Sequence, residues 1–207
     1  GEELDQRPRN PTASLGLADT TGFLTGHLHD INGALNIDAG TGANQLLISG
    51  ESSTLDNGDI VISDQINTGA GEPAGAEIAI RGLTGGDDAL GWVDLAQGTI
   101  TFRADAAGSF ANGVTVWTGF GADDITIDGT HDRAGLRTVT TLNTGLGDDT
   151  VRVDLDTGED GTFVLNTQGP WNDYPSISDD DVVLGTDTVG GAWASTLPLI
   201  VFGGQGN

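Results

Sequence analysis

The most constraining feature of this sequence is one short phrase that occurs twice, 26 residues apart. The segment Thr118–Ile125 contains a Gly-x-Gly turn, then a carboxylate and an apolar residue, and Thr144–Val151 repeats that form. The glycines allow backbone angles that residues with a Cβ resist. After the turn, apolar and polar residues alternate, as at Val151 and Val153, which is typical of a half-buried strand. The chain therefore uses one strand–turn–strand unit more than once.

Further Gly-x-Gly turns extend the repeat, with first glycines at Gly40, Gly69 and Gly204. Asn44 stands where the later copies have Asp, and Pro73 takes that position after Gly69. If two turns are degenerate, the average step is about 27 residues, which is typical of a solenoid and too short for the ~40 residues of a propeller blade. No helical periodicity is sustained. The sequence predicts an all-β fold, a parallel β-solenoid of the β-helix or β-roll kind with rungs of about 26–29 residues. An antiparallel β-sandwich is the alternative.

The domain organisation is expected to be simple. Residues 1–11 contain Arg7-Pro8-Arg9-Asn10-Pro11 and no strand pattern, so they predict a flexible lead-in. Residues 12–207 predict a single repetitive β domain. No starting Met and no signal peptide are visible, and the segment is expected to be a piece of a longer chain.

The charge and the lack of cysteine limit the classes of partner and of metal site that this chain could have. The formal net charge is −24, with 31 acidic residues against seven basic ones, and all seven are Arg. Such a charge repels phosphate backbones and anionic lipid, so nucleic acid is not an expected partner. There is no Cys, which excludes disulfides and thiolate metal sites. No apolar run approaches the roughly 18 residues of a membrane helix, and no membrane insertion is expected. A solvated acidic surface, as in salt-adapted proteins, is the alternative reading of the charge.

The repeated phrase resembles the nonapeptide Gly-Gly-x-Gly-x-Asp-x-U-x of RTX, or hemolysin-type calcium-binding, repeat proteins, where U is a large apolar residue. Both copies have Thr (Thr118 and Thr144) at the first glycine, and Gly203–Asn207 matches all three glycines. The resemblance implies a parallel β-roll with calcium between stacked turns, held by turn carbonyls and Asp carboxylates. It also implies a large secreted or cell-surface bacterial protein. Family repeats run in tandem every nine residues or so, whereas complete copies here are 26 residues apart.

The resemblance and the spacing together give a candidate calcium site. If 26 residues make one rung, the two turns lie about 4.8 Å apart. Asp123 and Asp149 would then lie one above the other, and a divalent cation would relieve their repulsion. The alternative is that these carboxylates close glycine turns and face water. The predicted calcium-binding residues are Gly119, Gly121, Asp123, Gly145, Gly147 and Asp149.

The predicted function is a non-catalytic structural or adhesive repeat module of a secreted or cell-surface protein. No nucleophile–base set is visible, so the chain is not expected to be an enzyme. The alternative is a β-helix module that binds or processes polysaccharide, with Trp117 among the aromatics and with Trp171 and Tyr174 as possible contacts to surface glycans. Self-association through the solenoid ends is a further expectation, because an unpaired strand edge such as Leu197–Phe202 invites another strand.

Overall fold

A computed structural model describes residues 28–31, 33–51, 53–85, 98–133, 135–145, 147–155, 161–167, 181–184 and 198–202. Regular structure in these ranges is almost entirely β-strand, with one short 3-10 turn at Thr68–Ala70 and no α-helix. The all-β prediction is therefore confirmed for the described part of the chain. None of its elements is a helix of the length and apolarity that a membrane span requires.

Strands form where Val, Ile, Leu and Thr alternate with polar residues. In β11, for example, Val151 and Val153 are buried while Arg152 between them is exposed, as the period of two requires. The strands are β1 (Leu35–Asp38), β2 (Gly42–Ala43), β3 (Leu46–Ser49), β4 (Ile60–Ser63), β5 (Ile78–Arg81), β6 (Ile100–Arg103), β7 (Gly108–Ser109), β8 (Val114–Gly119), β9 (Asp124–Asp128), β10 (Thr138–Gly145), β11 (Thr150–Val153), β12 (Gly161–Asn166), β13 (Asp181–Leu184) and β14 (Leu199–Phe202).

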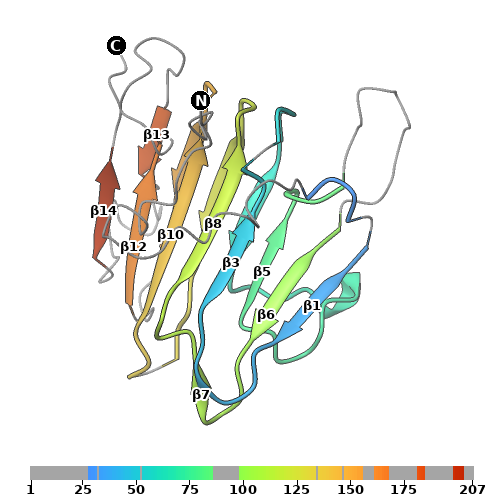
Figure 1. The fold of residues 1–207 in the computed structure, drawn as a ribbon, viewed down its shortest axis with the longest axis vertical. Coiled ribbons are helices and arrows are strands. Elements are labelled where there is room, and N and C mark those ends of the chain that lie inside the picture. The colour runs from blue at the N-terminus through green and yellow to red at the C-terminus, as the bar shows by residue number, and fades with distance from the viewer. Residues whose placement is uncertain are drawn as a thin grey trace, which may run out of the picture.

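These strands form two large sheets and one small one (Figure 1). The seven-stranded sheet has the order β1-β6-β5-β4-β9-β11-β13, the five-stranded sheet has the order β14-β12-β10-β8-β3, and β2 pairs with β7. From β8 to β14, consecutive strands lie alternately in the five-stranded and the seven-stranded sheet. The described strand pairs are parallel, except those that β5 makes with β4 and β6. Antiparallel pairing, the predicted alternative, thus occurs only around β5 in the described residues.

The register of the parallel pairs builds the core. In the five-stranded sheet, Val116, Leu142 and Leu165 are direct neighbours on β8, β10 and β12, and all three are buried. In the seven-stranded sheet, Ile125 lies beside Val151, and both are buried as well. Side chains from the two sheets form one apolar cluster. Burying each such side chain contributes about 1.5–3 kcal/mol, so this register is strongly favoured over one shifted by a residue.

The Gly40 turn is not equivalent to the turns at Gly119 and Gly145, and that prediction is wrong. The chain enters the five-stranded sheet from β1 through the Gly40 turn, and it leaves that sheet for β9 through the Gly119 turn. Because β3 and β8 are parallel, these two turns lie at opposite strand ends. The Gly40 carbonyl instead accepts from Asp105 N at 2.9 Å. The turn that lies against the Gly119 turn is instead the one that follows β3. It begins at Gly50, whose N donates to Trp117 O at 2.9 Å.

The Gly69 turn is also misplaced by the sequence pattern. Gly69 lies in the 3-10 turn of the link between β4 and β5, and not in a turn between the two sheets. This link and β5 are inserted between β4 and β6, so that the paired residues Asp38 and Arg103 are 65 residues apart. A Gly-x-Gly pattern predicts a turn, but it does not say which strand end carries it or whether it belongs to an insertion.

Candidate functional site

The predicted calcium-binding residues lie in two turns that are in direct contact. Gly119 ends β8, and Gly121 and Asp123 lie between β8 and β9. Likewise, Gly145 ends β10, and Gly147 and Asp149 lie between β10 and β11. Gly145 is paired with Gly119 in the parallel register. A Cβ on Gly145 would overlap the carbonyl oxygen of Gly119, and a Cβ on Gly147 would overlap that of Gly121. The structure therefore brings the six predicted residues together, and glycine is needed there because the neighbouring backbone occupies the space.

Hydrogen bonds join these turns through a series of side chains that we call the amide–carboxylate column: Asn57, Asp123 and Asp149. The Oδ1 atom of Asp149 accepts from the backbone N–H of Asp123 at 2.9 Å. The Oδ1 atom of Asp123 accepts from the backbone N–H of Asn57 at 3.0 Å and from its Nδ2 at 2.8 Å. Each carboxylate thus binds the backbone of the preceding turn. All three residues are buried, and Asp149 is 0 % exposed.

Thr118 and Thr144 take the position of the first glycine in the RTX pattern, and the Thr118 side chain makes a contact between the two turns. The Oγ1 of Thr118 donates to the carbonyl oxygen of Thr144 at 2.8 Å, again across a separation of 26 residues. Both threonines are buried. A glycine could not make this bond, so the departure from the family pattern adds a side-chain contact between the two turns.

The environment of Asp123 disfavours its charge. Burial raises the pKa of this carboxyl, while hydrogen bonds from Thr118 and Asn57 act in the opposite direction. The Thr118 hydroxyl donates to Thr144 O, so the bonds from Asn57 are the main contacts that favour the charged form of Asp123. The Oδ2 of Asp123 is buried and has no hydrogen-bond partner among the described residues. A buried carboxylate with an uncompensated oxygen favours neutralisation by a proton or a cation.

The donor set for calcium is small. Calcium takes six to eight oxygen ligands in typical sites. In the described residues, no group of three or more His, Asp or Glu side chains could hold a metal ion. Asp123 and Asp149 each use one carboxylate oxygen on a backbone amide. The described side chains therefore do not fill a calcium shell by themselves, and calcium binding at this pair stays a prediction.

The structure does not describe the residues that were predicted to contact glycans. Trp171 and Tyr174 lie outside the described residues, as does Gly203–Asn207. Trp117 is described, and its side chain is 0 % exposed. A fully buried indole offers no face to a sugar ring, so Trp117 packs in the protein instead.

The sequence pattern missed Asn57 as the first member of the column. Asn57 is the counterpart of Asp123 in the preceding turn, because it comes shortly before Ile60 as Asp123 comes shortly before Ile125, and Ile60 and Ile125 are paired. One extra residue separates Asn57 from its strand, which hides the match. The hydrogen bond from Asp124 N to Asn57 O at 2.9 Å corresponds to that from Thr150 N to Asp123 O at 2.8 Å, and it fixes the equivalence.

Comparison with known proteins gives no relative from which function could be carried over. The sequence matches no protein-family model, and neither a curated protein nor a solved structure matches it. The resemblance to RTX repeats is therefore neither supported nor opposed by these comparisons.

Proposed function

We propose that this chain is a non-catalytic structural module, a parallel β-solenoid segment of a large extracellular or cell-surface protein. The amide–carboxylate column carries the proposal, because it joins turns that are 26 and 66 residues apart in the sequence. Strands that alternate between two sheets in parallel register support the same reading. Each turn then stabilises its neighbour, which is the nearest-neighbour coupling of a repeat protein.

The state of the two carboxylates supports a structural role over a catalytic one. Paired carboxylates that hydrolyse sugars must reach the substrate and a water molecule. Asp123 and Asp149 are 2 % and 0 % exposed, and each binds a backbone amide. These groups hold the fold together and are closed to a substrate.

Calcium binding is the finer part of this proposal, and thermal unfolding tests it. If calcium binds between Asp123 and Asp149 in the folded state alone, excess calcium at about 100 times Kd should stabilise the protein by about 2.7 kcal/mol relative to chelator. Asp149→Asn should lose that gain, whereas Asp148→Asn, an exposed neighbour, should keep it. Equal melting temperatures in calcium and chelator would remove calcium and leave the structural module, because the column needs no metal.

The edge strand β14 supports the expected self-association. Val201 continues the buried series Leu142 and Leu165 on the neighbouring strands, yet it is 40 % exposed. Ile200 and Phe202 are exposed as well, and β14 pairs only with β12 among the described strands. An open edge with apolar side chains favours pairing with another strand.

Sedimentation velocity at several protein concentrations tests this edge. We expect the wild-type chain to associate and Val201→Asp to associate at least about tenfold more weakly, because burying a valine contributes about 1.5–3 kcal/mol and 1.4 kcal/mol is a factor of ten. Asp105→Asn, a change at an exposed residue in the turn before β7, is the control. Unchanged association of Val201→Asp would rule this edge out.

A further inference from the structure

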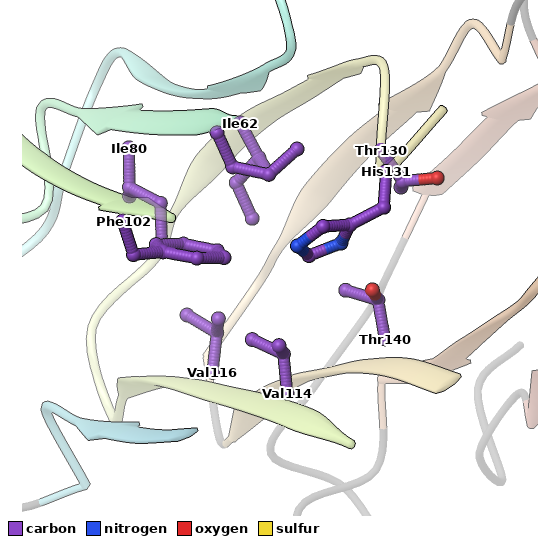
Figure 2. Close-up of a pocket in the computed structure, with 9 residues that line it drawn as sticks. Ile62, Ile80, Phe102, Val114, Val116, Thr130, His131 and Thr140 are labelled. Atoms are coloured by element: carbon purple, nitrogen blue, oxygen red, sulfur yellow. The ribbon is translucent and has the colours of Figure 1, made fainter. Parts of the chain in front are cut away.

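A histidine side chain is buried at one end of the apolar core. His131 lies just after β9 and is 4 % exposed. Figure 2 shows its ring in a small cavity between the two sheets. The ring centroids of Phe102 and Phe110 are 5.6 and 5.4 Å from that of His131. The cavity is lined mainly by apolar groups, among them Ile62, Ile80, Phe102, Val114, Val116 and Thr140.

Two charged groups face this ring. Glu77, the residue before β5, places Oε2 3.6 Å from His131 Nε2, and its Oε1 accepts from Arg133 at 2.7 Å. Arg133, two residues after the histidine, also donates to the carbonyl oxygens of Asp105 at 3.1 Å and Ala106 at 3.3 Å. Asp132 on the same segment is exposed. The residues that β4, β6, β8 and β10 present to the cavity carry no charge.

The imidazole is therefore held in its neutral form. Neither ring nitrogen has a hydrogen-bond partner among the described residues. The 3.6 Å separation from Glu77 is too long for a hydrogen bond. Burial, followed by the charge of Arg133, lowers the pKa of His131 to about 4. A proton on this ring would place a cation among aromatic and aliphatic side chains, which is costly.

We infer that His131 is an acid-sensitive latch, which fastens the segment 129–133 over the end of the core at neutral pH and releases it when the ring is protonated. The segment is held by the buried ring, by the Arg133–Glu77 ion pair and by the bonds from Arg133 to the turn before β7. Moving it outward is the shortest way to bring the ring to water. Its release would uncover the rings of Phe102 and Phe110, so that acid creates an apolar surface that is absent at neutral pH.

The direction and size of the effect follow from the pKa values. The pKa of His131 is lowered from 6.5 to about 4 in the folded protein. A lowered histidine pKa means that stability is full above the ordinary value and is lost as the pH falls toward the lowered one. If the open segment has the ordinary pKa, its population relative to the closed form rises about 30-fold between about pH 7.5 and pH 5.

Amide hydrogen exchange of the segment 129–133 tests the latch. After correction for intrinsic exchange rates, we expect protection in the wild type to fall about 30-fold between about pH 7.5 and pH 5. His131→Phe keeps a ring in the cavity without a titrating group, so its protection should not change with pH. The control His29→Gln changes a second histidine, which is half-buried and binds Ser53 Oγ at 2.6 Å, and this variant should respond as the wild type does.

A second measurement does not depend on any variant that might fail to fold. The chain has three histidines, so the ring protons of His131 can be followed through a pH titration by NMR. We expect His131 to titrate well below 6.5, near 4. The loss of protection should begin below pH 6.5 and level off near the pH at which the ring titrates. Titration at or above 6.5, or the same change in protection for His131→Phe and wild type, would overturn the latch.

Discussion

Replacing Gly145 with alanine is expected to lower the free energy of unfolding by about 2–5 kcal/mol, one of the two largest effects that we expect of a single substitution. The φ angle of Gly145 is +93°, which costs an L-residue about 1–2 kcal/mol. In addition, the new Cβ would overlap the carbonyl oxygen of Gly119. Neighbouring backbone cannot yield as a flexible side chain does, and overpacking of this kind costs about 1–3 kcal/mol. The two turns would have to separate.

Gly71→Ala is the matched control for this substitution. Gly71 has nearly the same φ angle, +90°, but nothing lies within 4 Å of a Cβ added there. Alanine at this position should therefore cost only the backbone strain, about 1–2 kcal/mol. Denaturant unfolding of both variants gives the comparison. Equal losses would mean that the turns at Gly119 and Gly145 do not touch.

Asp123→Ala is expected to cost about 2–4 kcal/mol, because it leaves the backbone N–H and the Nδ2 of buried Asn57 without their acceptor. Asp123→Asn keeps an oxygen at that position and removes a buried charge. Its stability near neutral pH should match or exceed that of the wild type. Denaturant unfolding in chelator measures both. An Asn variant as unstable as the Ala variant would show that the charge of the carboxylate is required for the bonds to Asn57.

The stability difference between Asp123→Asn and the wild type should also depend on pH. Burial raises the pKa of Asp123 above its ordinary value of 3.8, so the folded protein holds this proton more tightly than the unfolded chain does. The stabilisation is full below the ordinary pKa and is lost as the pH rises through the raised one. The stability of Asp123→Asn relative to wild type should therefore increase between about pH 4 and pH 7. A constant difference would contradict the raised pKa.

Local sequence pattern predicted much of this fold because the determinants are local. The alternation at Val151 and Val153 predicts a strand with one buried face, and both valines are buried in β11. The 26-residue spacing of Gly119 and Gly145 predicted their stacking, because two identical turns can share one register only when the strands between them match in length. The parallel pairing of β8 with β10 and of β9 with β11 agrees with that reasoning.

Other parts of the fold depend on contacts that no local pattern encodes. β5 is antiparallel to both of its neighbours, although Ile78–Arg81 has the same composition as the parallel strands around it. Its direction follows the path of the link from β4, which returns the chain to the neighbouring position in the same sheet. Gly40 has the positive φ angle of a tight turn, and Gly69 lies in a 3-10 turn. Which strand end each of these turns occupies depends on the strands that precede it.

The sequence predicted which carboxylates lie together in the candidate site, but it did not predict the hydrogen bonds that they make. The sequence identified Asp123 and Asp149 as neighbours, and the structure places them in contact. It did not predict that each carboxylate binds the backbone amide of the preceding turn. It did not predict Asn57 either, because the extra residue before Ile60 shifts the pattern. Hydrogen bonds between distant turns are a property of stacking, so they become visible only when the register is known.

Disulfide cross-linking between β9 and β11 tests the 26-residue register most directly. The chain has no Cys, and Thr126 lies beside Arg152 in the parallel pair. Adjacent strands are about 4.8 Å apart, within the roughly 4.4–6.8 Å that a disulfide accepts between Cα atoms. Within the described residues, removing Arg152 breaks an exposed ion pair with Asp124, which contributes little.

Mild oxidation of the folded Thr126→Cys/Arg152→Cys double variant should therefore give a rapid intramolecular cross-link. Thr126→Cys/Asp154→Cys, in which the second position is displaced by two residues to just beyond the end of β11, should cross-link slowly or not at all. If the displaced pair reacted as fast, or if neither pair reacted, the turns at Gly119 and Gly145 would not lie one above the other, and the stacked module would be refuted.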